Sequence, residues 1–326
     1  MLDEVAPWPL RWIVDEDGRD TGFAMLRREV PNGSRAAFDE MAASHRMIGF
    51  THYGPFPLYH EAYDGRRKGK FPKKGWQRPE VRACEAWAHC FREPARYLPP
   101  GKPRIFISGS DFVDHEAKWA AAHAEGKPAK RWDLIYSCLP TWLNELQKNV
   151  DLARACALRL AGAGARIVMV GRAGTPGLAY HPNIDHLPQL TWREFMRVTA
   201  ASRVAFLPNC WDASPRVITE SLSVDVPVLV NRQILGGWKY VAAETGAFFD
   251  DENDVVDAFF AILDSSLSPR DWLLSNGYGQ DAAARRLAAE LRALGDPPGD
   301  GASLAGTIPC GELAYALPTS SAPQAA

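Results

Sequence analysis

The stretch that decides the fold is Asp212-Ala-Ser-Pro-Arg-Val-Ile-Thr-Glu-Ser-Leu-Ser-Val-Asp-Val-Pro-Val-Leu-Val. A strand over residues 204–208 is predicted just before it, its middle predicts a helix over residues 216–223, and its last five residues predict a further strand. A loop at the carboxyl end of a strand that opens a helix is where open α/β sheets bind phosphorylated ligands. Two carboxylates in this place, Asp212 and Glu220, indicate a ligand that carries hydroxyl groups as well as phosphate.

Strands and helices alternate on both sides of this stretch. We predict further strands over residues 132–137, 165–170 and 247–249, and helices over residues 150–160, 192–201 and 254–263. Thr191 is the expected N-cap of the second of these helices, with Glu194 at the capping-box position. Strands that alternate with helices of this length imply a parallel sheet with crossover connections.

The first half of the chain is less regular. Strands are predicted over residues 10–14, 47–51 and 103–108, and helices over residues 35–45 and 80–92. Residues 114–130 are polar and carry no apolar periodicity, which is typical of a linker. This half is therefore expected to be a small α/β domain.

Bulk properties fit a globular protein with no broad attraction to polyanions. The chain has 326 residues, of which 46% are apolar and 23% charged, and its formal net charge is -2. Its six cysteines are scattered without CxxC spacing, which favours reduced thiols in a cytosolic protein. No apolar run approaches the roughly 20 residues of a spanning helix, and the N-terminus lacks the regions of a signal peptide. We expect a cytoplasmic protein, with peripheral association at a membrane surface as the open alternative.

Two charged runs leave alternatives open. Arg66-Arg-Lys-Gly-Lys-Phe-Pro-Lys-Lys74 carries six basic residues. It is either a solvated loop or a contact for an anionic acceptor such as a lipid phosphate, an acidic glycan or nucleic acid. Asp15-Glu-Asp17 has the D-x-D form of a metal-binding motif, but it lies far in the sequence from the phosphate-site features, so we discount it. The sequence shows no His/Cys/Asp cluster with metal-ligand spacing.

Four segments in order carry a resemblance to a known family: residues 184–195, 201–209, 212–231 and 245–249. Together they resemble the donor-nucleotide domain of GT-B glycosyltransferases, most of all the retaining group with an E-x7-E signature. The lysine-bearing loop at Lys148 and the strand ending in Gly171-Arg172 occur in the matching order, and the resemblance covers about residues 130–265. It implies an α/β fold of two Rossmann-like domains facing each other, with a small N-terminal domain.

The resemblance also implies an activity. It is transfer of a hexosyl group from a nucleoside diphosphate sugar to an acceptor hydroxyl, with retention, without a metal and with no cofactor besides the donor. On this basis residues 1–112 are the acceptor-side domain, 113–131 the linker, 132–280 the donor domain, 281–295 a C-terminal helix and 296–326 a disordered tail. A GT-B-like sugar-nucleotide 2-epimerase and a non-catalytic nucleotide-sugar binder remain as alternatives.

Several residues receive donor-site roles through this resemblance. Lys148 is expected to balance charge on the leaving diphosphate, and the first amides of the 216–223 helix, those of Arg216 and Val217, to hold the β-phosphate. Asp212 is expected to contact sugar hydroxyls and Glu220 the ribose hydroxyls.

Four more residues complete the expected site. Gly171 is predicted to allow close approach of the nucleotide, Arg172 to flank the diphosphate or the base, and Ser214 to belong to the same donor loop. His52, in the loop after the 47–51 strand, is predicted to bond the donor sugar or the acceptor.

The sequence departs from the family at the same site. The first acid of the signature is aspartate, Asp212, whose carboxylate reaches about one methylene less far than that of glutamate. The Gly-Phe-Gly run of the family is replaced by Ala213-Ser-Pro, and the arginine that often precedes the loop lysine is absent. Arg172 and Arg216 are the candidates to supply that missing charge.

Overall fold

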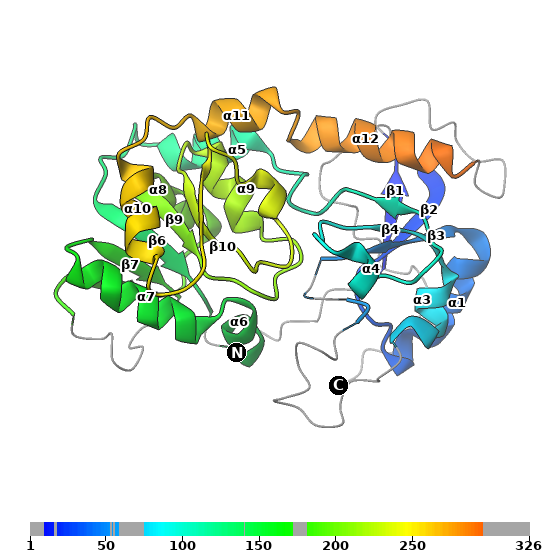
Figure 1. Ribbon diagram of the computed structural model, residues 1–326. Helices are drawn as coiled ribbons and strands as arrows, with labels where there is room; N and C mark the ends of the chain where they lie inside the picture. Colours follow the sequence, from blue (N-terminus) through cyan, green and yellow to red (C-terminus); the bar gives the residue numbers. More distant parts are fainter. Residues whose placement is uncertain are drawn as a thin grey trace. The chain divides into compact units, whose positions relative to one another are not determined.

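The computed structural model describes residues 10–295, apart from residues 16–17, 53, 55, 59–74, 140 and 172–180. It consists of two compact units (Figure 1). The first unit contains the chain up to His89, then Glu93–Ser108 and the segment from Gln280 on. The second unit contains Cys90–Arg92 and Gly109–Gly279.

The first unit is built on a five-stranded sheet in sequential order. Its strands are β1 (Leu10–Val14), β2 (Asp20–Leu26), β3 (Arg46–Phe50), β4 (Cys84–Ala88) and β5 (Arg104–Ile105). β1 is antiparallel to β2, and the other pairs are parallel. The helices of this unit are α1 (Arg35–Ser44), α3 (Pro79–Ala83), α4 (Pro94–Tyr97) and α12 (Gln280–Ala293), with 3-10 turns η1 (Asn32–Ser34) and η2 (Gly75–Gln77).

The predicted helix over residues 80–92 is wrong. Only α3 is helical there, and the chain then becomes strand β4, hydrogen-bonded between β3 and β5. Ala and Glu favour a helix here, but Trp87 is fully buried opposite Gly49, where any Cβ would overlap the indole ring. Packing in the sheet therefore overrides helix propensity.

Helix α12 is part of the first unit although it follows the second in sequence. Arg46 on β3 donates from Nη2 to the Leu294 carbonyl at 2.8 Å and also binds the Glu85 carboxylate. A guanidinium at the last carbonyls of a helix satisfies acceptors that have no partner within the helix.

The second unit has a six-stranded, wholly parallel sheet in the order β11-β10-β9-β6-β7-β8. Its strands are β6 (Trp132–Ser137), β7 (Ile167–Val170), β8 (Ile184–Leu187), β9 (Ser202–Leu207), β10 (Val228–Asn231) and β11 (Gly246–Phe249). Read from β8, the order is the 3-2-1-4-5-6 arrangement of dinucleotide-binding folds. The order reverses between β6 and β9, so this is where such sheets bind ligands.

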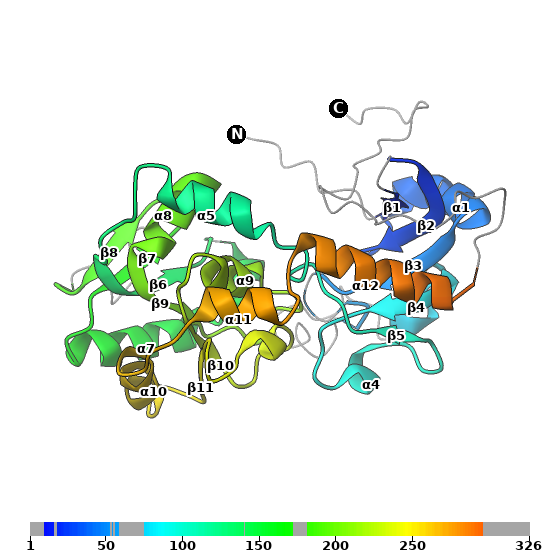
Figure 2. The same cartoon turned by 90° about the horizontal axis from the view of Figure 1, so that it is seen from above.

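Helices cover both faces of this sheet (Figure 2). On one face α7 (Val150–Gly162) and α10 (Val255–Leu263) pack on one apolar cluster. On the other face the second cluster includes residues of α5 (His115–His123), α8 (Trp192–Ala200), α9 (Arg216–Ser223) and α11 (Pro269–Ser275). The predicted capping box of α8 is present, with both Thr191–Glu194 hydrogen bonds formed. The alternating pattern of the sequence therefore predicted five of the six strands of this sheet, whereas β8 was not predicted.

The stretch expected as a linker contains a helix. α5 lies within residues 113–131, is capped by Asp114, and is part of the second unit. Arg172, the basic run at residues 66–74, the D-x-D motif and the tail from residue 296 lie wholly or partly outside the described residues. Within the described part of the chain, no helix is both long and apolar enough to cross a bilayer.

Candidate functional site

Two loops meet at the carboxyl ends of β6 and β9, where the strand order reverses. The loop after β6 contains α6 (Trp142–Gln147) and ends at Lys148, and the loop after β9 runs from Pro208 to the start of α9. Since β6 and β9 are parallel neighbours, their following loops lie at the same edge of the sheet.

Lys148 and Asp212 form an ion pair across these loops. Lys148 Nζ lies 3.1 Å from Asp212 Oδ2, with side chains 16% and 13% exposed. The carboxylate also accepts from Asn209 Nδ2 at 3.0 Å and from the Ser214 backbone N–H at 3.2 Å. Because three donors hold it, the Asp212 carboxylate has a fixed orientation in the loop.

Asn149 joins the two loops next to this pair. It adopts a left-handed backbone with φ of 49°, and its Nδ2 donates to Cys210 Sγ at 3.1 Å. The Cys210 N–H bonds the Gln147 carbonyl at 3.2 Å. Burial raises the pKa of the Cys210 thiol, so at neutral pH it is a packed thiol and not a thiolate.

Two glycines, Gly236 and Gly237, pack against the loop that contains Asp212. The Gly236 N–H donates to the Asp212 carbonyl at 2.9 Å, and a Cβ on Gly236 would overlap the carbonyl of Ala213. Gly237 has φ of +81°, and a Cβ there would lie 2.9 Å from Pro215 Cδ. Glycine is needed at Gly236 because its backbone contacts that of Ala213, and at Gly237 because of its positive φ and its contact with the Pro215 ring.

The N-terminus of α9 follows directly. Pro215 is its N-cap and, among the residues that the structure describes, no side chain caps the first turn or accepts from the amides of Arg216 and Val217. Ser214 does not supply an acceptor, since its hydroxyl lies 2.9 Å from Ser110 Oγ and accepts from the Ser110 N–H at 3.0 Å. The uncapped helix start is an electropositive feature at the edge where Lys148 lies.

Glu220 lies on α9 but contacts a different lysine. Its Oε1 is 3.1 Å from Nζ of Lys118 on α5, and the side chains are 12% and 16% exposed. The same ammonium lies 4.2 Å from the ring centre of Trp192, the first residue of α8, which is 40% exposed. Glu220 is thus held by a cation beside a partly exposed indole.

Gly171 and His52, two further residues of the predicted site, lie in different units. Gly171 directly follows β7 and has φ of +86°, and a Cβ on it would lie 2.9 Å from the Cys138 carbonyl oxygen, so contact with the loop after β6 already requires glycine. His52 belongs to the first unit, where its ring stacks on Phe50 with centroids 6.2 Å apart. The structure thus brings Lys148 and Asp212 together, whereas His52 lies in the other unit.

Several site residues were missed from the sequence. Lys118 lies in a stretch without apolar periodicity, and nothing in the sequence pairs it with Glu220. Asn209 could have been found, because it directly follows a predicted strand and precedes Asp212 in the loop. In the described ranges, no group of three or more His, Cys, Asp or Glu side chains is arranged to hold a metal ion.

Comparison with known proteins gives matches among solved structures. Searches with protein-family models and among curated protein sequences found no match. Sucrose-phosphate synthase from Thermosynechococcus elongatus aligns with a TM-score of 0.60 and 13% identity, over 80% of this chain and 71% of its own. The α,α-trehalose 6-phosphate synthase of Burkholderia multivorans aligns with a TM-score of 0.56 and 14% identity, over 80% and 69%.

A third neighbour was solved with ligands. The pneumococcal O-GlcNAc transferase GtfA, in complex with UDP and GlcNAc, has a TM-score of 0.54 and 12% identity, over 81% of this chain but only 55% of its own. These three neighbours are glycosyltransferases of the GT-B fold. The chain therefore has the GT-B fold, with one Rossmann-like sheet in each unit, as the sequence predicted.

Proposed function

We propose that this protein is a glycosyltransferase that moves a hexosyl group from a nucleoside diphosphate sugar to an acceptor hydroxyl. One observation carries the proposal. The Lys148–Asp212 pair and the uncapped start of α9 lie on the loops that follow β6 and β9, at the reversal of strand order. That edge offers a cation, free amides and a carboxylate to one ligand, and a sugar attached to a diphosphate needs all three.

The diphosphate would be held by positive groups. Lys148 and the Arg216 and Val217 amides would stabilise the charge that develops on the β-phosphate as the anomeric C–O bond breaks. Arg172 would flank the diphosphate, and Gly171 would let the nucleotide approach β7. Lys148 would have to share its ammonium between Asp212 and the phosphate.

The hydroxyl groups of the donor would be held by the carboxylates. Asp212 would accept from hydroxyls of the transferred sugar, with Ser214 in the same loop, and Glu220 from the ribose. The three donors on Asp212 leave lone pairs free on its two oxygens, since an ionised carboxylate has about four acceptor positions. His52 would bond the donor sugar or the acceptor.

The reaction would proceed with retention and without a metal. The acceptor hydroxyl would attack the anomeric carbon on the face that the diphosphate leaves, forming the new C–O bond as the old one breaks. Its proton would pass to the departing β-phosphate oxygen, so that no separate general base is required. The products would be the glycoside and the nucleoside diphosphate.

Turnover with and without acceptor tests this function. The full chain is incubated with UDP-, GDP- and ADP-sugars and candidate acceptors, and nucleoside diphosphate release and glycoside formation are measured. Release that depends on an acceptor supports the transferase. A C2-epimerised donor, or nucleotide binding without any turnover, would replace it with the epimerase or with the non-catalytic binder.

A further inference from the structure

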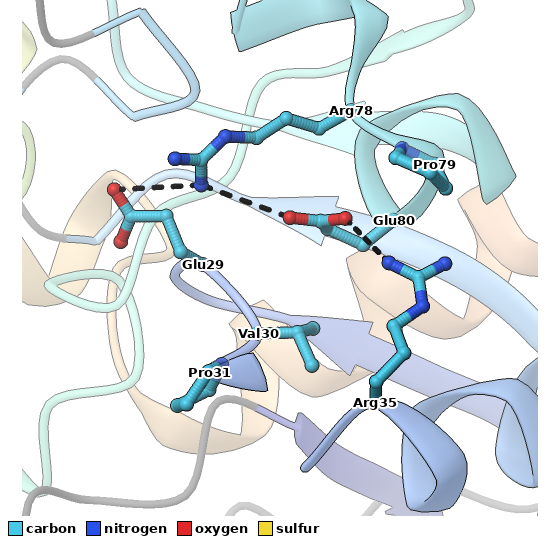
Figure 3. A pocket seen from close by; sticks show the side chains of 7 residues that line it. All are labelled: Glu29, Val30, Pro31, Arg35, Arg78, Pro79 and Glu80. Atoms are coloured by element: carbon cyan, nitrogen blue, oxygen red, sulfur yellow. Dashed lines mark hydrogen bonds and ion pairs between the residues drawn. The ribbon is translucent and has the colours of Figure 1, made fainter. Parts of the chain in front are cut away.

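A pocket lies wholly within the first unit, lined only by residues of that unit. It has a volume of about 640 Å³, and Figure 3 shows its side chains arranged around one opening. The residues that line it are Glu29, Val30, Pro31, Arg35, Arg78, Pro79 and Glu80. They come from the segment between β2 and α1 and from the start of α3, with Arg35 as the first residue of α1.

Four charged side chains alternate in sign along this pocket (Figure 3). Arg35 Nη1 lies 2.9 Å from Glu80 Oε2, which is a normal hydrogen bond. Arg78 Nη1 lies 3.7 Å from Glu80 Oε1 and 3.8 Å from Glu29 Oε1. Two arginines and two glutamates give the lining no formal net charge.

Arg78 is the unusual member of this row. Both of its ion-pair distances exceed hydrogen-bonding range, and within the described residues its guanidinium has no acceptor closer. The side chain is 26% exposed and that of Glu29 is 27% exposed. The Arg78 guanidinium and the Glu29 carboxylate thus line the pocket with hydrogen-bonding capacity that a ligand hydroxyl beside them can use.

The Arg35–Glu80 end of this row of charges is held in place by hydrogen bonds. Glu80 is 5% exposed, and its bond to Arg35 compensates the cost of burying its charge. Arg35 is in turn held by Asp39 one turn further along α1, at 3.1 Å. The Arg35–Glu80 pair is therefore structural, while Arg78 and Glu29 are the groups available to a ligand.

We propose that this pocket binds a neutral saccharide. A hydroxyl group in the pocket, beside the 3.7 and 3.8 Å ion pairs, can accept from Arg78 and donate to Glu29 or Glu80 without changing the charge of the pocket. An anion would face two carboxylates and a cation two guanidinium groups, so a ligand with net charge would lose as much as it gains. Val30, Pro31 and Pro79 supply apolar surface for the C–H face of a sugar ring.

The size of the pocket agrees with such a ligand. Its volume lies within the range of roughly 300–1,000 Å³ found for small-molecule sites. All the lining residues belong to the first unit. Saccharide binding here can therefore be tested independently of nucleotide binding in the second unit.

Titration calorimetry of the full chain with glucose, N-acetylglucosamine, their methyl glycosides and maltose tests the site, with inorganic phosphate as the anionic comparison. We expect at least one neutral sugar to bind, with an affinity that changes less than about twofold between low and high salt, because screening acts on charged ligands. Arg78→Met and Glu29→Gln should each weaken that binding at least about fivefold, the scale of one lost hydrogen bond. Arg82→Met is the control, since Arg82 is exposed on α3, and this variant should bind the sugar as the wild type does.

Thermal unfolding of the variants shows whether a loss of binding comes from misfolding. Glu29→Gln keeps the size of a partly exposed side chain and leaves the Arg35–Glu80 pair in place, so its thermal unfolding should match the wild type. Absence of binding by every neutral sugar would overturn the proposal. So would phosphate binding in place of sugar binding, or unchanged sugar affinity in both folded variants.

Discussion

Lys148 and Asp212 are 64 residues apart in sequence, yet Nζ of the lysine lies 3.1 Å from Oδ2 of the aspartate. The contact exists because β6 and β9 are neighbours, so their loops share one edge of the sheet. Asp212 is also held by Asn209, and Lys148 is its only side-chain partner that carries a charge among the described residues. A ligand phosphate at this edge would therefore find a lysine already in place.

Replacing Lys148 should affect turnover far more than stability. In Lys148→Ala, Asp212 keeps its bonds to Asn209 and to the Ser214 N–H, so we expect a loss of about 1 kcal/mol or less in unfolding free energy. Turnover should fall by about 100-fold or more, because the developing diphosphate charge loses its cation. Steady-state kinetics and chemical denaturation measure both, with Lys127→Ala at an exposed position as control. Wild-type kinetics in Lys148→Ala would remove the lysine from the diphosphate site.

Glu220 should matter for nucleotide affinity. Glu220→Ala is expected to weaken nucleoside diphosphate binding by roughly 1–3 kcal/mol, the range for a hydrogen bond to a charged group. Lys118→Met should weaken it as well, because the carboxylate would lose the ammonium that holds it 3.1 Å away. Calorimetry on both variants gives the comparison, and unchanged affinity in Glu220→Ala would exclude the ribose role.

Gly236 should be intolerant of a methyl group. Its Cβ would overlap the Ala213 carbonyl, so Gly236→Ala must displace the acidic loop, at a cost of about 2 kcal/mol or more. Gly162→Ala is the matched control, because nothing lies within 4 Å of its Cβ and it ends helix α7. That variant should be slightly more stable than the wild type, by up to about 1 kcal/mol. Equal unfolding midpoints for the two variants would contradict the close contact.

Acid should destabilise the second unit through His115. Burial lowers the pKa of this imidazole below its ordinary 6.5, and nearby Arg270 lowers the pKa further. Its Nε2 donates to the Tyr278 carbonyl at 2.8 Å and its Nδ1 lies 2.8 Å from Ser223 Oγ. The unfolded chain takes up a proton first as the pH falls, so stability is full above pH 6.5 and declines below it.

Melting temperatures measured from pH 7.5 downward test this linkage. The melting temperature of the wild type should fall below about pH 6.5. His115→Gln should have a lower melting temperature at pH 7.5, and its melting temperature should fall less as the pH is lowered. His123→Gln, on the same helix, should keep the slope of the wild type. Parallel profiles for the wild type and His115→Gln would show that another group causes the acid sensitivity.

The regular parts of the fold were predictable because local pattern and packing agree there. Helix α9 was predicted with the bounds that the structure has, and the Thr191–Glu194 capping box formed as expected. Strand β4 was not predictable, since its helix-favouring residues are held extended by pairing with β3 and β5. Helix α5 lacked a sequence signal because its apolar stripe is short, with only Ala122 of its apolar residues buried.

The candidate site was likewise only partly predictable from the sequence. The resemblance selected Lys148 and Asp212 as members of one site, and the sheet topology brings them together. Neither the Lys118–Glu220 pair nor the contact of Gly236 with the Asp212 loop could be predicted. Both depend on segments far apart in the sequence whose proximity is set by helix packing and loop closure.

Nucleotide binding to the full chain tests the central claim most directly. Calorimetric titration with UDP, GDP and ADP, and with the matching nucleosides, separates the contribution of the diphosphate from that of base and ribose. We expect one nucleoside diphosphate to bind clearly more tightly than its nucleoside, and Lys148→Ala to abolish most of that difference. Binding that is equal with and without the diphosphate, or no binding of any of the three, would contradict the assignment.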